Sequence, residues 1–256
     1  MFVLLKIENL FYSPVKSISL TESITLNIIK DRGIENDRIF AFTQNLDTFQ
    51  IKNLEQKPHL RKLNNFITLK NSPELNQYNF LLNKDQLILK KSSEEIIKIN
   101  PYAKDERVLL LNQISKFIKK EKKINFVIDQ KNPFFDTMPS NSISLINKNS
   151  INDFEKKINT EIEIERFRAN IYIDGLKAWE ERTWIGKIIE INNIKFSVTK
   201  EIPRCSATNL QPNTDNVTIN LPNQLKKTYD HIYMGVYLTP LSNGDINIDN
   251  ELRIYD

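Results

Sequence analysis

Cysteine and histidine are both scarce in this sequence of 256 residues. Cys205 is the only cysteine, and His59 and His231 are the only two histidines. A single thiol excludes an internal disulfide, a cysteine-rich zinc site and an iron–sulfur cluster held by four cysteines of this chain. The two histidines lie far apart in the sequence, so a histidine-based metal site is not expected either.

Glycine and long apolar runs are also in short supply. The sequence has five glycines, and none of its apolar runs approaches the ~20 residues that a membrane-spanning helix needs. Residues 1–17 begin with a short apolar stretch, but no basic region precedes it and no small-residue cleavage site follows it. We therefore expect a cytoplasmic protein that has no membrane partner.

The overall composition is that of an ordinary globular protein, with slightly more basic than acidic residues. Hydrophobic residues make up 40% of the chain, and the net charge is +4. The densest basic run, residues 116–123, follows an amphipathic segment, and a solvated helix end explains it better than a nucleic-acid site. No nucleic-acid partner is expected, and the length allows one large domain or two small ones.

Short apolar or alternating segments separated by turns predict a protein built mainly of strands. These segments are residues 2–12, 22–29, 38–44, 65–70, 78–90, 161–174, 187–199, 231–238 and 245–255. Within the last part, Asn243-Gly244-Asp245 predicts a hairpin turn. Between the two groups of strands, the polar residues 92–104 include Pro101 and form a plausible domain boundary.

Two helices are expected between the groups of strands. In residues 105–120, the apolar side chains recur at helical spacing and define one buried face. In residues 150–158, Ser150 and Asp153 have the spacing of a capping box. Few helices among many strands favour a β-barrel-like architecture with helical inserts.

Four regions combine residue types that are suited to chemistry: residues 13–17, 33–38, 166–184 and 203–208. Taken singly, each region also has a purely structural explanation. A lone cysteine is more often a small buried apolar side chain than a ligand. Lys16 and Arg38 could be surface charges at strand ends. Asp37 and Arg38 could form an ion pair in a turn that contributes little to stability. The tryptophans on either side of Glu180 could serve packing alone.

In their order along the chain, these motifs resemble the MOSC family, which is named after the C-terminal domain of molybdenum-cofactor sulfurases. The motifs are PVKS at 14–17, GIENDR at 33–38, FRANIYIDG at 167–175, AWEERTW at 178–184 and RCSAT at 204–208. The resemblance covers nearly the whole chain and implies a mainly β (α+β) fold. It implies an N-terminal β-barrel domain over residues 1–95 and a MOSC β-barrel domain with helical inserts over residues 96–256.

The resemblance also implies a binding site for the molybdenum cofactor, with Cys205 as the catalytic residue and the ligand of the metal. A thiolate suits a metal that the dithiolene sulfurs of a pterin already hold, and Arg204 beside it would favour the ionised thiol. Other residues at the family's positions would hold the pterin and its phosphate. They are Lys16, Ser17, Arg38, Arg168 and Asn170, with Asn147 and Ser150 near a helix N-terminus as further hydrogen-bond donors.

The chain departs from the family's pattern in three loops. Alanine replaces the usual proline in 168–170, and residues 49–53 lack the arginine that commonly follows the DR strand. The usual Pro-x-Thr-Gly becomes Pro212-Asn213-Thr214-Asp215, so an aspartate is expected at the left-handed position of the glycine. These loops line the expected pocket, so the departures bear on substrate preference more than on cofactor binding.

The function that the resemblance implies is a molybdenum-dependent oxidoreductase that reduces N-hydroxylated or N-oxide-type small molecules. The alternatives are a carrier of sulfur or of the cofactor without redox turnover, and a degenerate fold that binds no cofactor. The chain is too short for the pyridoxal-phosphate domain of full sulfurases, so pyridoxal phosphate is not expected. With one cysteine and no G-x-G-x-x-G after a strand, electrons are expected from an external, ferredoxin-like or flavodoxin-like protein.

Overall fold

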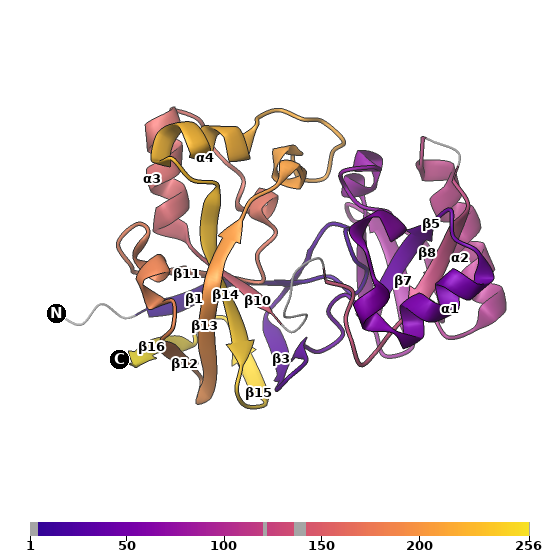
Figure 1. Cartoon of the computed structure of the whole chain (residues 1–256), viewed down its shortest axis with the longest axis horizontal. Coiled ribbons are helices and arrows are strands. Elements are labelled where there is room, and N and C mark those ends of the chain that lie inside the picture. Colours follow the sequence, from indigo (N-terminus) through magenta and orange to yellow (C-terminus); the bar gives the residue numbers. More distant parts are fainter. Residues whose placement is uncertain (1–4, 120–121, 136–141, 256) are drawn as a thin grey trace.

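The computed structural model describes residues 5–119, 122–135 and 142–255, which form two lobes that lie side by side (Figure 1). The barrel lobe contains strands β1–β4 and β10–β16, and the small lobe contains strands β5–β9. Among the described residues, no helix is both long and apolar enough to cross a membrane.

A closed ring of strands forms the centre of the barrel lobe. Its seven strands follow the order β11–β10–β14–β13–β12–β16–β1, and β1 pairs with β11 to close the ring. Neighbours are antiparallel except for β10 and β11, which are parallel, and β2 (Thr21–Ser23) adds to β1 outside the ring. The ring strands are β1 (Leu5–Tyr12), β10 (Ile143–Asn147), β11 (Ile171–Asp174), β12 (Ile188–Ile191), β13 (Ile194–Pro203), β14 (Tyr233–Pro240) and β16 (Glu251–Tyr255).

The apolar residues of these strands explain why the ring closes around a core. In β13, Ile194, Phe196 and Val198 are buried while the residues between them are more exposed, which is the period of a strand with one buried face. Every residue of β10 is buried. Its Leu145 faces the ring core, whereas Ile146 packs against the helix α3 (Lys148–Ile158) outside the ring.

A small sheet adds apolar residues to the same core. It consists of β3 (Thr25–Ile29), β4 (Gly33–Ile34) and β15 (Gly244–Asn247), and its Leu26 and Ile246 pack within the ring's core cluster. The predicted hairpin turn at residues 243–245 was wrong, because Gly244 begins β15 and that strand pairs with β3 instead of β14. The alternation of apolar and polar residues in β15 does not show that its pairing partner, β3, lies more than 200 residues earlier in the sequence.

Helices α3 and α4 (Leu221–Tyr229) lie against the same side of the ring (Figure 1). The helix predicted at residues 150–158 is confirmed, but it begins at Lys148 after the N-cap residue Asn147. The predicted capping box was therefore wrong: Ser150 lies inside the helix and is fully buried, and the Asp153 carboxylate accepts hydrogen bonds from other elements.

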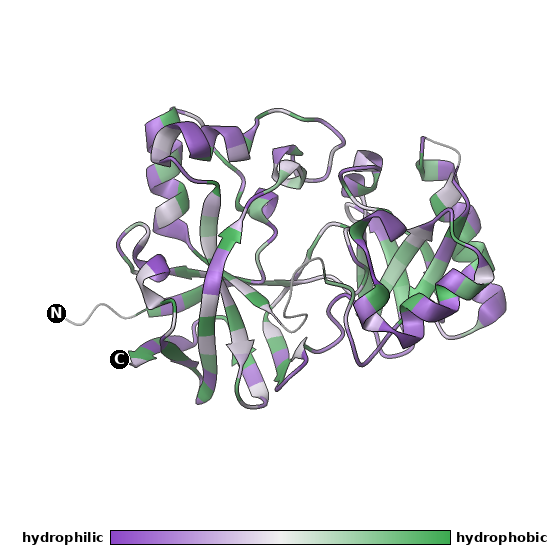
Figure 2. Cartoon of the chain, in the orientation of Figure 1, coloured by the Kyte–Doolittle hydropathy of each residue, from purple (hydrophilic) through white to green (hydrophobic). Residues whose placement is uncertain are grey.

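The small lobe consists of two small sheets with helices around them. Leu110 and Ile114 of α2 are fully buried, which confirms the predicted helix and its apolar face. Figure 2 shows the strands of this lobe as largely hydrophobic and its helices as more hydrophilic. The elements are β5 (Phe40–Gln44) with β9 (Ile124–Ile128), β6 (Asn79–Asn83) with β7 (Gln86–Lys91) and β8 (Glu94–Ile99), and the helices α1 (Thr48–Gln56) and α2 (Lys104–Phe117).

Short 3-10 helices occupy several connections in both lobes. Three of them, η2, η4 and η6, lie next to the cavity described below. The 3-10 helices are η1 (Pro58–Leu60), η2 (Leu63–Asn65), η3 (Pro73–Gln77), η4 (Ile164–Phe167), η5 (Glu180–Trp184) and η6 (Ser206–Asn209).

The expected fold class, mainly β (α+β) with a barrel and helical inserts, is confirmed. Strand pairing does not follow the expected boundary at residue 95. Strand β1 belongs to the ring of the barrel lobe, and β9, which lies after residue 95, pairs with β5 of the small lobe. The division into residues 1–95 and 96–256 therefore stays a prediction about domains and does not describe the sheets.

Candidate functional site

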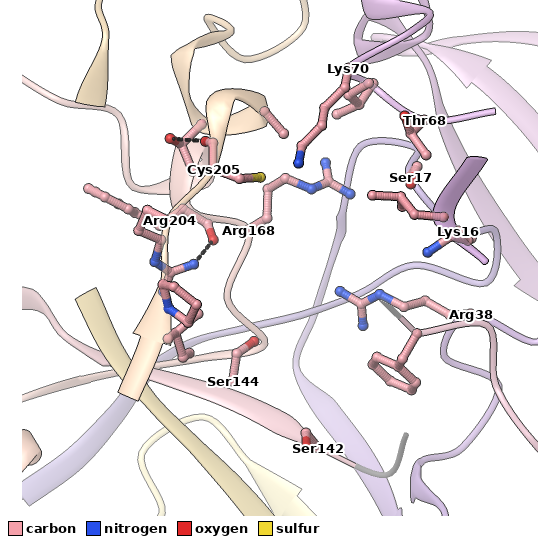
Figure 3. A pocket seen from close by; sticks show the side chains of 18 of the residues that line it. Lys16, Ser17, Arg38, Thr68, Lys70, Ser142, Ser144, Arg168, Arg204 and Cys205 are labelled. Atoms are coloured by element: carbon pink, nitrogen blue, oxygen red, sulfur yellow. Dashed lines mark hydrogen bonds between the residues drawn. The ribbon is translucent and has the colours of Figure 1, made fainter. Parts of the chain in front are cut away.

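A cavity of about 370 Å³ lies where the two lobes meet, and Figure 3 shows most of its side chains. The barrel lobe contributes Cys205 and its neighbours, and the small lobe contributes the segment around Lys70. The lining residues are Lys16, Ser17, Arg38, Leu63, Thr68, Leu69, Lys70, Phe134, Phe135, Ser142, Ser144, Phe167, Arg168, Asn170, Ile202, Pro203, Arg204, Cys205, Ala207, Thr208 and Tyr237.

Cys205 sits in the short turn between β13 and η6, with an exposed side chain. Pro203 pairs with Tyr233 of β14, which anchors the chain just before the turn. After it, Thr208 donates to the carbonyl oxygen of Cys205 twice, from its backbone N–H at 3.0 Å and from its hydroxyl at 2.8 Å. The backbone on both sides of the thiol is thus fixed while the thiol itself remains accessible.

Arg204, whose charge interacts with that of Cys205, also has a structural role. Its guanidinium is buried and donates to the carbonyl oxygens of Phe167, at 2.7 Å, and Met234. Burial lowers the pKa of Arg204 from its usual value. Figure 3 shows the side chain directed away from the sulfur of Cys205, so Arg204 ties the loop before β11 to β14.

Arg168 and Asn170 lie between η4 and β11, the parallel neighbour of β10. Arg168 donates from Nη2 to the carbonyl oxygen of Ile18 at 2.6 Å, and its side chain extends into the cavity (Figure 3). The Asn170 amide accepts from the Ser144 hydroxyl at 2.8 Å and donates to the Phe11 carbonyl at 3.0 Å. Asn170 therefore joins β1, β10 and β11 at the cavity lining.

Lys16, Ser17 and Arg38 come from two segments that lie side by side. The backbone N–H of Arg38 donates to the Ser13 carbonyl at 2.6 Å, and that of Lys16 donates to the Phe40 carbonyl at 2.8 Å. Lys16 is only 3% exposed, and its ammonium lies 5.4 Å from the centre of the Phe66 ring. These bonds hold both basic side chains at the wall that faces Cys205 (Figure 3).

Asp37 stands directly behind this basic wall. Its carboxylate accepts from the Ser13 backbone N–H at 2.8 Å and forms an ion pair with Arg38. Asp37 is 1% exposed, so this pair is buried and is not the weak surface pair that the sequence allowed. Burial raises the pKa of Asp37, while the nearby charges of Arg38 and Arg168 oppose that rise.

Two of the expected cofactor-binding residues, Asn147 and Ser150, lie elsewhere. Both are fully buried, and neither lines the cavity. The Ser150 hydroxyl lies 2.8 Å from the Glu181 carboxylate, and the Asn147 amide donates to the Lys177 carbonyl at 2.7 Å. Glu181 is itself fully buried, and that burial raises its pKa. At the start of α3 these two side chains contact other buried groups, away from the cavity.

Several lining residues were not expected from the sequence, and Lys70 is the most notable. It follows the isolated strand pairing of Phe66 with Thr43, in a turn of the small lobe. Figure 3 shows its ammonium directed toward the Cys205 thiol and the Arg168 guanidinium. Lysine and arginine together number 36 in this chain, so no local pattern distinguished Lys70 from the others.

The charge of the cavity lining has one sign. The lining includes five basic side chains, and no Asp or Glu is among the described residues that line it. The same described part of the chain contains no cluster of three His, Cys, Asp or Glu side chains that could hold a metal ion by themselves. The arrangement can therefore bind an anion and present one soft ligand or nucleophile, the Cys205 thiol, beside it.

Comparison with curated proteins gives partial similarity to one kind of protein. The chain is 30% identical over 87 residues to "Mitochondrial amidoxime reducing component 2" of Rattus norvegicus, and 28% identical over 87 residues to the protein of that name from Bos taurus. Each match covers 34% of this chain and 25% of the relative, so it spans a quarter of the relatives' length.

Two solved structures also show similarity. YuaD of Bacillus subtilis is 12% identical with a TM-score of 0.46, and the match covers 99% of this chain and 97% of that one. YiiM of Geobacillus stearothermophilus is 18% identical with a TM-score of 0.36, over 44% of this chain and 54% of that one.

The family comparison covers the part of the barrel lobe that follows the small lobe in the sequence. Residues 134–253 match the family model of the MOSC domain. This range begins at Phe134 in the cavity lining and includes Arg168, Cys205 and all ring strands except β1 and the end of β16. This chain therefore contains a MOSC domain, formed by residues 134–253.

Proposed function

We propose that this protein binds the molybdenum cofactor and reduces N-hydroxylated or N-oxide-type small molecules with electrons from an external protein donor. One observation carries the proposal: the cavity between the lobes combines the exposed Cys205 thiol with a lining whose charged side chains, in its described part, are all basic. The MOSC domain and the partial similarity to proteins named amidoxime reducing components support a reaction of this class.

The residues of the cavity fit such a cofactor in their chemistry. A thiolate is a suitable ligand for a soft metal bound by dithiolene sulfur, and Cys205 is the only thiol of the chain. A pterin phosphate needs cationic donors, and Lys16, Arg38 and Arg168 bring positive charge from different segments into one space. The volume of about 370 Å³ lies within the roughly 300–1,000 Å³ typical of small-molecule sites.

The chain's own residues would bind and orient the reactants. When bound, the cofactor supplies the redox chemistry of the reaction. Cys205 would present its thiolate from a backbone that Thr208 fixes, and Ser17 and Asn170 would stand beside the cationic residues that hold the phosphate. Leu63 and Phe135 offer apolar surface for the carbon skeleton of a substrate.

Reducing equivalents would come from a separate protein. Within this sequence the single cysteine cannot hold an iron–sulfur cluster, which commonly needs four cysteine ligands. A basic chain with a net charge of +4 favours an acidic partner, such as a ferredoxin-like or flavodoxin-like protein. Electrostatic attraction of this kind raises the rate of association and depends on salt.

The test is to purify the protein from cells that make the cofactor and to measure molybdenum and pterin per chain. Benzamidoxime is then supplied with NADH alone and with reduced methyl viologen. We expect about one molybdenum per chain, reduction with the viologen and none with NADH alone. Protein that carries no molybdenum and takes up none on incubation with the cofactor contradicts the proposal, and efficient turnover with NADH alone contradicts the external donor.

A second candidate function rests on the accessibility of the thiol. An exposed, single Cys205 in a basic cavity also suits a protein that carries sulfur as a persulfide or hands over the cofactor. Cofactor-loaded protein that stays inactive with reduced viologen, together with a persulfide on Cys205 detected by mass spectrometry, would favour this carrier function over the reductase.

A further inference from the structure

Lys70 is held in place by the turn that carries it. The backbone N–H groups of Asn71 and Ser72 donate to the Thr68 carbonyl at 3.0 and 2.8 Å, and the Thr68 N–H donates to the Asn71 side chain at 3.0 Å. The turn thus projects the Lys70 side chain from the small lobe toward the barrel lobe. Its ammonium points toward Cys205 and Arg168 (Figure 3).

The surroundings of Lys70 differ from those of the other basic residues in the cavity. Arg38 is paired with the buried Asp37, and Arg204 donates to backbone carbonyls. For the Lys70 ammonium, no hydrogen-bond acceptor or carboxylate is in contact within residues 5–119, 122–135 and 142–255. The positive charge that points toward the thiol therefore has no counter-charge from the described protein.

This position separates Lys70 from Lys16 and Arg38, two of the residues that would hold the cofactor phosphate. Lys16 and Arg38 form the deeper basic wall, with Lys16 almost fully buried. Lys70 is exposed to solvent at the cavity and reaches toward the thiol. A ligand that binds in the cavity beside Cys205 can therefore contact this ammonium, and the apolar lining residues Leu63 and Phe135 can contact its carbon skeleton.

Resting on the proposed function, we propose that Lys70 makes the site select substrates that carry an anionic group, such as N-hydroxylated compounds with a carboxylate. The ammonium attracts the anionic group and holds it near the place where the substrate meets Cys205. A neutral substrate of the same shape lacks this attraction. Lys70 is in this view a specificity-determining residue, and its charge, not its size, carries the effect.

The first test uses the single cysteine as a probe and needs no cofactor. The purified chain is alkylated at Cys205 with iodoacetate, which is anionic, and with iodoacetamide, which is neutral. The ratio of the two rates reports the local potential, because a change in thiol reactivity affects both reagents alike. At low salt, we expect Lys70→Gln to lower this ratio about three- to fivefold, the range of a solvent-exposed charge pair, and added salt to reduce the difference.

Matched variants decide the result. Lys70→Arg should keep the wild-type ratio, and so should Lys52→Gln, which removes an exposed lysine of the same lobe on α1. An unchanged ratio in Lys70→Gln, or an equal fall in Lys52→Gln, overturns the inference whether or not the cofactor is bound.

The second test measures selection in the cofactor-loaded protein. Benzamidoxime and its 4-carboxylate are compared as substrates with reduced viologen. We expect Lys70→Gln to raise KM for the carboxylate alone, with kcat and the neutral substrate little changed. Equal effects on both substrates overturn the inference. Protein that reduces neither substrate contradicts the proposed function instead, and Lys70 is then judged by the alkylation ratio.

Discussion

Three residues of the cavity lining adopt the left-handed backbone conformation without being glycine. Ser17, Arg38 and Arg168 have φ angles of 60°, 55° and 53°. Such a conformation costs a non-glycine residue about 1 kcal/mol or more, so neighbouring bonds must hold it. The backbone N–H of Arg168 donates to the Glu165 carbonyl at 3.0 Å, and that of Arg38 to Ser13. At these positions the backbone turns so that both guanidinium groups reach one cavity.

Replacement of Cys205 by alanine should abolish activity and leave the fold intact. The side chain is exposed, so its loss should change the free energy of unfolding by no more than about 0.5 kcal/mol. No other thiol exists in the chain to replace it as a ligand. The measurements are molybdenum content, viologen-driven turnover and thermal unfolding, with Ser206→Ala as the control. Wild-type turnover in the loaded Cys205→Ala variant would rule out the ligand assignment.

Glu181 makes the stability of the barrel lobe depend on pH. Burial raises its pKa above the ordinary value of 4.5, so the native state keeps this proton to a higher pH than the unfolded chain does. Stability from this group is therefore present at low pH and lost as pH rises from 4.5 through the raised pKa. We expect Glu181→Gln to gain thermal stability relative to wild type over this range. Glu180→Gln, half-buried on the same turn, should keep the wild-type profile.

At this scale, the sequence motifs predicted residues that line the cavity, but they did not separate these from residues that are buried elsewhere. Lys16, Arg38, Arg168 and Cys205 come together as the motifs implied. Ser150 does not: it was expected from its place near a helix N-terminus, and its spacing to Asp153 cannot tell a capping residue from one inside the helix. Lys70 was missed because its role follows from the direction of a turn in another lobe.

The loop after η6 connects the Cys205 turn to the small lobe. In this loop, the backbone carbonyls of Gln211 and Thr214 both accept hydrogen bonds from the Asn76 side-chain amide, each at 2.8 Å. The left-handed residue of this loop is Asn213, with φ of 59°, and not Asp215 as expected from the missing glycine. Asparagine tolerates this conformation better than most residues, and Asp215 instead pairs with Lys119 of the small lobe at 2.6 Å.

Asn76 should therefore control how firmly the Cys205 loop is held. Asn76 is 6% exposed, and its backbone carbonyl also accepts from the Ser19 hydroxyl at 2.7 Å, close to the Lys16 segment. Asn76→Ala removes the amide donor of the Thr214 carbonyl, whereas the Gln211 carbonyl still accepts from Thr214, so the loss should cost about 1–3 kcal/mol of stability. We expect faster alkylation of Cys205 and a lower unfolding temperature, with Asn83→Ala, exposed at the end of β6, unchanged.

Removing the outer contact of the same loop should matter much less. Lys119 and Asp215 are partly exposed to solvent, with side chains 70% and 27% accessible, so their ion pair contributes at most about 1 kcal/mol. If Lys119→Ala loosens Cys205 as much as Asn76→Ala does, the buried amide is not what holds the loop.

Helices and strands could be predicted where the pattern of apolar residues within the element itself shows them. The apolar face of α2 and the alternation of β13 appear in the sequence as periodicity. Helix α4 was not predicted, although Asn220 accepts from the Asn223 N–H and proline follows Leu221, because the segment has only two fully buried residues, Leu221 and Leu225. The partner of β15 depends on a strand near the other end of the sequence, which no local pattern encodes.

At the scale of the whole molecule, the cavity exists only because both lobes contribute to it. Lys16 and Arg38 should hold the same anion as Arg168, so loss of any one charge weakens a partly desolvated contact by about 2–5 kcal/mol. We expect Lys16→Gln, Arg38→Gln and Arg168→Gln each to purify with little molybdenum, measured per chain, while Lys52→Gln keeps its full content. Full occupancy in all three variants would show that these residues do not bind the cofactor.

The closure of the ring by β1 also has a consequence for how the chain folds. Leu10 of β1 pairs with Ile171 of β11, and Leu5 pairs with Leu252 of β16. During synthesis, β2 can pair with β1 early, but the edge of β1 that joins β11 stays unpaired until residues 171–174 have left the ribosome, and the ring closes only after β16 follows. Contacts this distant slow folding and prolong exposure of apolar edges. The barrel lobe should depend on chaperones at an early stage at which the small lobe, whose strands are closer in sequence, can already form.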